Sequence, residues 1–162
     1  MTHQVFIGLG SNLQNPQAQV DQALQALIAL PHTTLAARSR LYRSAPQGFL
    51  SQPDFVNAVA LLQTHLAPLD LLHQLRAIEN RHQRQRPFPN APRTLDLDML
   101  LYDALVLNSP QLVLPHPRMG QRAFVLRPLQ ELAPDLIIPG LGSVDQLLGQ
   151  CLTQDATPLG AS

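Results

Sequence analysis

Residues 93–102 read Arg93-Thr94-Leu95-Asp96-Leu97-Asp98-Met99-Leu100-Leu101-Tyr102, which places two carboxylates two positions apart in an otherwise apolar run. In a β-strand, side chains at i and i+2 share one face, so Asp96 and Asp98 would project together while Leu97 faces the other way. Two like charges side by side on a half-buried surface are costly unless a cation or several donors neutralise them. A hard divalent cation is the simplest neutraliser, and the stretch therefore predicts a strand with a metal site.

The same stretch allows a second interpretation, a helix that Asp96 caps and that runs through Leu97 to Leu107. In a helix the two carboxylates would point apart, so the argument for a metal site would fall. The pattern alone favours the strand and leaves the helix open.

The length and composition indicate one domain, residues 1–162. The chain has 162 residues and is 45% hydrophobic, which suffices to bury a core without disulfides or structural metals. The single cysteine, Cys151, cannot form an internal disulfide. No positively charged and apolar leader precedes Val5, and no apolar run approaches the roughly 20 residues of a membrane span. We expect a cytoplasmic, monomeric protein that does not enter a membrane, with a frayed tail at about 152–162.

The charges are spread unevenly over a chain whose formal net charge is zero. Zero net charge argues against a general binder of nucleic acid or membrane surfaces. From Arg76 to Arg93, however, five arginines face one acid, Glu79, and the window carries +4. All the basic residues are Arg, and the absence of Lys excludes a P-loop, a Schiff-base enzyme and a protein-kinase site. Arg binds phosphate through a planar fork, so the window suits a phosphorylated ligand unless it is only a solvated face.

The remaining pattern predicts alternating strands and helices. We expect strands at 5–9, 34–42 and 55–62, a hairpin of 105–107 with 112–114, and helices from Asn15-Pro16 to Pro31, from Pro68 to about Gln83, over 122–132 and from Ser143 to about Gln150. Gly8-x-Gly10 lacks the third glycine of a dinucleotide fingerprint, so we interpret Gly10 to Asn12 as a turn. The order fits an α+β, ferredoxin-like βαββαβ sandwich with an extra hairpin and C-terminal helices, both main helices covering one face.

Two further segments suggest a ligand. Asn57 interrupts an apolar strand, and with Phe55 on the same face it would suit a flat heterocycle, although an amide satisfied by a neighbouring strand is as good a reading. His116 stands between two prolines, which argues against a place in a helix or a central strand and favours exposure to solvent or to a ligand, although a lone His is more often structural. Together with the paired aspartates and the arginines, these features describe a metal-assisted phosphoryl-type transfer.

The motif Pro92-Arg93-Thr94-Leu95-Asp96-Leu97-Asp98-Met99-Leu100 closely resembles the signature of the 6-hydroxymethyl-7,8-dihydropterin pyrophosphokinase family. The resemblance continues through most of the chain. It includes Gly10-Ser11-Asn12, Tyr42-Arg43-Ser44, Gln52-Pro53-Asp54-Phe55-Val56-Asn57, Pro115-His116-Pro117 and Arg122-Ala123-Phe124. The chain departs from the family in its segment 85–92, which lacks the usual Trp.

The resemblance implies transfer of pyrophosphate from ATP to the pterin hydroxymethyl group, which yields AMP, with two Mg²⁺ ions held by Asp96 and Asp98. It implies that Arg84 and Arg93 are catalytic. The nucleotide-binding residues it implies are Arg76, Glu79, Arg84, Arg86, Arg93, Met99, His116 and Arg122. The pterin-binding residues it implies are Ser44, Ala45, Gln47, Phe55, Asn57 and Phe124.

A different class of function remains as the alternative. In a non-catalytic, ferredoxin-like ligand-binding module, Arg84, Asp96 and Asp98 would form an ordinary solvated ion-pair network. Such a module has no need for two aspartates on an apolar strand, and its Asp96→Ala variant would gain stability and keep its ligand.

Overall fold

The computed structural model describes residues 1–12, 15–45, 53–82 and 95–159. Within these residues the main element is a six-stranded sheet whose pairs are all antiparallel. Its strands are β1 (His3–Ser11), β2 (Thr33–Arg38), β3 (Tyr42–Ser44), β4 (Phe55–Thr64), β5 (Asp96–Tyr102) and β10 (Thr157–Pro158). The order is β10-β3-β4-β1-β5, with β2 on another part of β4, so β1 lies between β4 and β5, and β5 lies at an edge.

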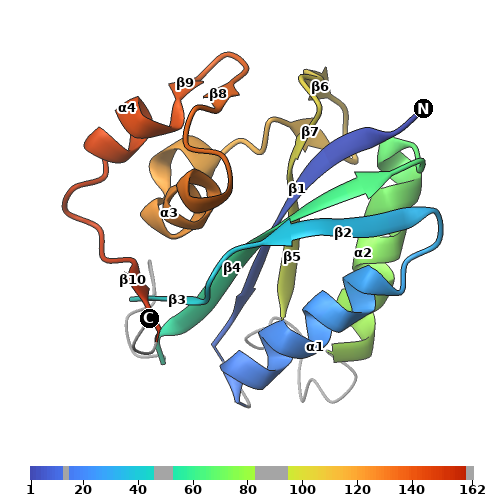
Figure 1. Cartoon of the computed structure of the whole chain (residues 1–162), viewed down its shortest axis with the longest axis horizontal. Coiled ribbons are helices and arrows are strands. Elements are labelled where there is room, and N and C mark those ends of the chain that lie inside the picture. Colours follow the sequence, from blue (N-terminus) through green and yellow to red (C-terminus); the bar gives the residue numbers. More distant parts are fainter. Residues whose placement is uncertain (13–14, 46–52, 83–94, 160–162) are drawn as a thin grey trace.

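Helices cover both faces of this sheet (Figure 1). They are α1 (Pro16–Ile28), α2 (Pro68–His82), α3 (Ala123–Leu132) and α4 (Val144–Gly149). On β1, Val5, Ile7 and Leu9 face the core under α1 and α2. Phe6 points the other way, into a second cluster with α3 and α4. One strand therefore supplies both cores by simple alternation.

The predicted βαββαβ order is confirmed, and so are the extra hairpin and the C-terminal helices. The short pairs are β6 (Leu107–Asn108) with β7 (Val113–Leu114), and β8 (Ile137–Ile138) with β9 (Gly142–Ser143). Ser143 caps α4, since its Oγ accepts a hydrogen bond from the Gln146 N–H at 3.1 Å. The part of the chain that the structure describes holds no helix long and apolar enough to cross a membrane.

The predicted strand over 34–42 is two strands. β2 pairs with β4 from Thr64 to Ala60, and β3 pairs with β4 from Asn57 to Phe55. Between them, the Ser39 hydroxyl donates to the Arg40 carbonyl at 2.7 Å and accepts from the Val59 N–H at 2.9 Å. At the break between β2 and β3, the Ser39 side chain thus replaces a main-chain acceptor of the sheet.

Three smaller expectations were wrong. β1 runs on through Ser11, so Gly10 and Ser11 belong to a strand and not to a turn. The spacing of Val20, Leu24, Leu27 and Ile28 predicts one buried stripe on α1, but Ile28 is exposed and Ala23 is buried instead. The tail expected to be frayed is ordered as far as Leu159, because β10 pairs with β3 and the Leu159 N–H donates to the Leu41 carbonyl at 2.9 Å.

Two leucines of α2 allow a matched test of this packing. Leu75 is 0% exposed in the core, whereas Leu69 on the same helix is 42% exposed. We expect Leu75→Ala to lower the free energy of unfolding by about 2–5 kcal/mol, because it leaves a cavity. Leu69→Ala should change it by no more than about 0.5 kcal/mol. Urea denaturation measures both, and equal losses would contradict the buried face assigned to α2.

Candidate active site

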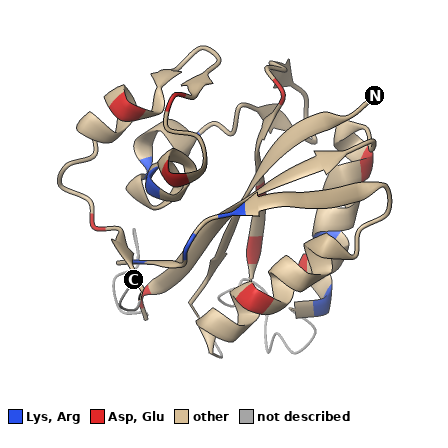
Figure 2. Ribbon diagram, viewed as in Figure 1, with Lys and Arg blue, Asp and Glu red and all other residues tan. Residues whose placement is uncertain are grey.

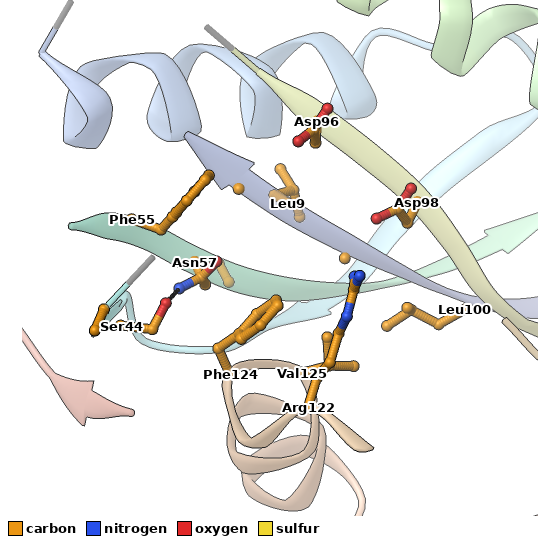
Figure 3. Close-up of a pocket in the computed structure, with 14 residues that line it drawn as sticks. Leu9, Ser44, Phe55, Asn57, Asp96, Asp98, Leu100, Arg122, Phe124 and Val125 are labelled. Carbon is orange, nitrogen blue, oxygen red and sulfur yellow. Dashed lines mark hydrogen bonds between the residues drawn. The ribbon is translucent and has the colours of Figure 1, made fainter. Parts of the chain in front are cut away.

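A pocket lies between the sheet and the beginning of α3 (Figure 3). Its lining comes from β1, β3, β4, β5 and α3 or residues next to them. The lining residues are Gly8, Leu9, Gly10, Ser44, Ala45, Phe55, Asn57, Ala58, Asp96, Asp98, Leu100, Arg122, Phe124 and Val125. The pocket is polar along β5 and aromatic toward β4 and α3.

Asp96 and Asp98 share the pocket face of β5 (Figure 3). Figure 2 shows acidic colour on β5, and the other residues of this strand are uncharged. Leu97 and Met99 face the other way, into the core under α1 and α2. The strand interpretation is thus confirmed, and the capped helix is wrong because Asp96 and Asp98 pair with Gly10 and Gly8 of β1.

A β-bulge follows the aspartates. Ile7 pairs with Met99 and Phe6 with Leu101, so Leu100 is an extra residue in β5. The His116 N–H donates to the Leu100 carbonyl at 3.0 Å, which holds the Pro115-His116-Pro117 corner beside the site. His116 is thus bonded to the main chain of β5 at the bulge.

His116 Nε2 lies 4.0 Å from Asp98 Oδ1. The Arg118 N–H donates to His116 Nδ1 at 3.2 Å, so in the neutral ring the proton is on Nε2 and faces the aspartate. Burial lowers the pKa of His116, and the Asp98 carboxylate acts against that change. The ring can thus offer an N–H to Asp98 or to a ligand beside it.

Arg122 stands between the acidic and the aromatic parts of the pocket. It immediately precedes α3 and extends toward Asp98 (Figure 3), and its guanidinium carbon lies 5.4 Å from the centroid of the Phe124 ring. Burial lowers the pKa of Arg122, while Asp98 and Asp96 raise it. Among the described residues that line the pocket, Arg122 is the positively charged one. Its planar guanidinium group suits a phosphate group.

The aromatic part has a buried amide at its centre. Asn57 is 3% exposed, and its Nδ2 donates to Ser44 Oγ at 2.7 Å. It lies between Phe55 and Phe124 in the view of Figure 3. A Cβ at position 10 would come within 3.2 Å of Asn57 Oδ1, so Gly10 leaves room for this amide. Two rings and an oriented amide suit a flat, hydrogen-bonding heterocycle.

Glu79 and Arg76 lie on α2 and do not line this pocket. Glu79 is 3% exposed, and its carboxylate accepts hydrogen bonds from the Leu97 N–H and from Arg76, each at 2.7 Å. In the sequence, Glu79 flanks the apolar residues Leu71, Leu72, Leu75 and Ile78, which predicts a position beside the core, whereas the structure buries it. Burial raises the pKa of this carboxyl, and its hydrogen bond with Leu97 and the nearby Arg76 act in the opposite direction.

The structure brings together most of the predicted residues that it describes. Those that line the pocket are Ser44, Ala45, Phe55, Asn57, Asp96, Asp98, Arg122 and Phe124. Met99 is buried in the opposite core. Gln47, Arg84, Arg86 and Arg93 lie outside the described residues.

Sequence reasoning missed Gly8 and Gly10 as pocket residues. Both belong to β1, and each pairs with one of the aspartates. The sequence did contain a signal for them, two glycines that alternate with apolar residues in a strand. Glycine inside a strand often marks a place where a ligand or another backbone segment approaches closely.

The two carboxylates fit Mg²⁺ as donors. Within the described residues, no group of three or more His, Cys, Asp and Glu side chains gathers as a metal cage. Mg²⁺ does not need such a cage, because it commonly binds through one or two carboxylates, several waters and the phosphates of a substrate. Asp96 and Asp98 could hold it in that way, with Arg122 near the phosphates.

The arrangement can place a phosphorylated ligand beside a flat ring system. Asp96, Asp98 and Arg122 supply the charge that polyphosphate and a cation require. Phe55, Asn57 and Phe124 supply an apolar slot with hydrogen-bonding groups at its edge. A group transfer between two small molecules suits this geometry.

Comparison with known proteins agrees with the geometry. The family model described as 7,8-dihydro-6-hydroxymethylpterin-pyrophosphokinase matches residues 6–134. A 2-amino-4-hydroxy-6-hydroxymethyldihydropteridine pyrophosphokinase from Pseudomonas aeruginosa is 50% identical over 151 residues, which are 93% of each chain. The protein of that name from Haemophilus influenzae is 44% identical over 145 residues, 90% of this chain and 91% of its own.

A solved structure shares the fold. The crystal structure of Plasmodium falciparum HPPK-DHPS superposes with a TM-score of 0.73 over 94% of this chain, at 12% identity. This chain spans 46% of that protein, so the likeness concerns one part of it. On the family match and the two bacterial relatives, the chain belongs to the 7,8-dihydro-6-hydroxymethylpterin-pyrophosphokinase family.

Proposed function

We propose that this chain transfers pyrophosphate from ATP to the hydroxymethyl group of 6-hydroxymethyl-7,8-dihydropterin, a step of folate biosynthesis. The hydroxymethyl oxygen forms a bond to the β-phosphorus and releases its proton. The bond from that phosphorus to the oxygen shared with the α-phosphate breaks, and AMP leaves with the electron pair. The observation that carries the proposal is one pocket that joins paired aspartates to an aromatic slot with a buried amide.

Asp96 and Asp98 are the proposed ligands of two Mg²⁺ ions. Bound there, the ions would supply charge neutralisation and orientation for the phosphates. Both aspartates are assigned this role because they lie on the face of β5 that lines the pocket. Arg122 lies within the electrostatic reach of both carboxylates and is the proposed partner of a phosphate oxygen.

The pterin is proposed to lie between Phe55 and Phe124. Asn57 would read its edge, because one amide presents both a donor and an acceptor. Ser44 fixes the orientation of that amide through its hydroxyl. Ala45, a lining residue, and Gln47 complete the proposed set.

The proposed nucleotide contacts lie along β5 and beyond it. His116 and Arg122 reach the acidic part of the pocket with their side chains, and Arg76 reaches β5 from α2. Met99 can contribute its main chain, since its side chain is in the core. Arg84, Arg86 and Arg93 are proposed as nucleotide contacts from the resemblance to the family, with Arg84 and Arg93 as catalytic residues. The enzyme is proposed to be monomeric, single-domain and cytoplasmic.

The reaction assay separates this function from a non-catalytic binding module. Protein mixed with Mg²⁺, ATP and 6-hydroxymethyl-7,8-dihydropterin should form AMP in a one-to-one ratio with the pterin consumed. Chromatography of the nucleotides measures it. ADP in place of AMP, or AMP that forms without pterin, would refute the proposal.

The aspartate pair allows a test with a neighbouring control. Asp98→Asn removes a proposed ligand charge, and metal-assisted charge stabilisation amounts to several kcal/mol, so kcat should fall by roughly 100-fold or more. Asp103→Asn is the control, because Asp103 lies just beyond β5 and bonds with His3 and the Gln4 N–H. Steady-state rates at saturating Mg²⁺ and ATP measure both, and similar losses would count against the assignment.

Asn57 allows the pterin assignment to be tested apart from ATP. Asn57→Ala removes the amide, and each lost hydrogen bond of about 1 kcal/mol lowers affinity about fivefold. We therefore expect pterin affinity to fall roughly 5- to 30-fold, while binding of an ATP analogue with Mg²⁺ stays within about twofold. Isothermal titration calorimetry measures both ligands. Asn108→Ala, at an exposed position of β6, is the control, and an equal loss of both ligands in Asn57→Ala would contradict the assignment.

A further inference from the structure

Leu97 is the residue that separates the two aspartates, and its main chain is bonded to α2. The Leu97 N–H donates to Glu79 Oε2 at 2.7 Å, and the Leu97 carbonyl accepts from Arg76 Nη1 at 3.0 Å. Because β5 lies at the edge of the sheet, main-chain groups on its outer side pair with no further strand among the described residues. Two side chains of α2 take the place of that strand.

The two side chains also bond to each other. Arg76 Nη1 donates to Glu79 Oε1 at 2.7 Å across one turn of α2. We call Arg76, Glu79 and the main chain of Leu97 the Leu97 clamp. Each carboxylate oxygen of Glu79 has a donor, and the residue is 3% exposed. The clamp is therefore a closed set of charge-assisted hydrogen bonds at the back of the acidic site.

Packing alone does not explain a carboxylate at this place. Burial raises the pKa of Glu79, and Asp96 adds a smaller effect in the same direction, so the folded chain disfavours the charged form. Replacing buried ionic groups with apolar side chains of similar volume often leaves stability unchanged or raises it. What a carboxylate supplies, and a leucine cannot, is two directed acceptors for Leu97 and Arg76.

We propose that Glu79, together with Arg76, is a positioning residue that fixes the main chain of β5 so that Asp96 and Asp98 meet Mg²⁺ as a pair. The inference deepens the proposed function and rests on it, since the cation belongs to that reaction. It gives Glu79 a role that acts through Leu97, in place of the direct nucleotide contact that the resemblance implies. Groups that orient metal ligands typically change metal affinity or activity 10- to 100-fold when they are removed.

The test uses Glu79→Gln with a matched carboxylate as control. Glutamine has one acceptor oxygen, so it turns an NH₂ group toward one of the two donors and opens the clamp. Glu131 on α3 has the same chemistry elsewhere, because it accepts from the Arg40 N–H at 3.0 Å, from Arg40 Nε at 3.3 Å and from the Tyr42 hydroxyl at 2.6 Å. Glu131→Gln therefore opens a comparable network that does not touch β5.

The first measurement needs neither metal nor substrate. Amide hydrogen exchange of the free protein, followed by NMR, should show the Leu97 amide exchanging at least tenfold faster in Glu79→Gln, with no change at Leu97 in Glu131→Gln. Unchanged exchange at Leu97 would overturn the clamp. If Glu79→Gln fails to fold, Arg76→Met opens the clamp from a side chain that is 47% exposed, and the same exchange result is required of it.

The second measurement is the Mg²⁺ concentration that half-saturates binding of a non-hydrolysable ATP analogue, by calorimetry. We expect it to rise roughly tenfold in Glu79→Gln and to stay within twofold in Glu131→Gln. An unchanged midpoint would overturn the proposal. So would an equal loss of analogue affinity with and without Mg²⁺, because Glu79 would then be a nucleotide contact.

The proposed function and the positioning role of Glu79 can be refuted separately. If the wild-type protein forms no AMP, the proposed function falls, whereas exchange at Leu97 still reports on the clamp. If the wild-type protein is active and Glu79→Gln has the wild-type Mg²⁺ midpoint, the positioning role falls and the function stands.

Discussion

The constraint on which the pocket depends is the position of β5. This edge strand must keep Asp96 and Asp98 at the pocket while Leu97 and Met99 fill the core under α1 and α2. Pairing with β1 secures one side of the strand, and the bonds from α2 to Leu97 secure the other. A slip by one residue would exchange the two faces and bury the charges, so strand register and site geometry are a single requirement.

The neighbouring strand is adapted to the same requirement. Gly8 and Gly10 pair with Asp98 and Asp96, and a Cβ at position 8 would come within 3.4 Å of the Leu100 side chain. Gly10 also leaves room for the amide oxygen of Asn57. The bulge at Leu100 then interrupts the alternation of side chains along β5, so that Leu100 and Leu101 both pack in the cluster under α3 and α4. The Leu100 carbonyl accepts the hydrogen bond from the His116 N–H. Space for a ligand is thus built into the backbone.

The sequence predicted what periodicity controls. The two-residue alternation around Asp96, the apolar stripe of α2 and the order of the elements were all visible in it, and the family motif gathered residues that do share one pocket. It could not predict what depends on distant partners. The bulge at Leu100 requires the register of β1, the break at Ser39 requires the Val59 N–H, and the ordered tail requires β3. Glu79 resembled a surface charge in the sequence because the N–H that its carboxylate binds belongs to β5, a strand that begins 17 residues later.

Arg122 has a consequence for how two ligands influence each other. Its guanidinium interacts electrostatically with the Asp98 carboxylate and also lies over the Phe124 ring. A ligand that draws Arg122 toward the acidic side changes the face that Phe124 offers to a second ligand. By thermodynamic linkage, the second ligand then changes the affinity of the first by the same factor. A ligand that moves this one side chain therefore links the two halves of the pocket without a change in the fold.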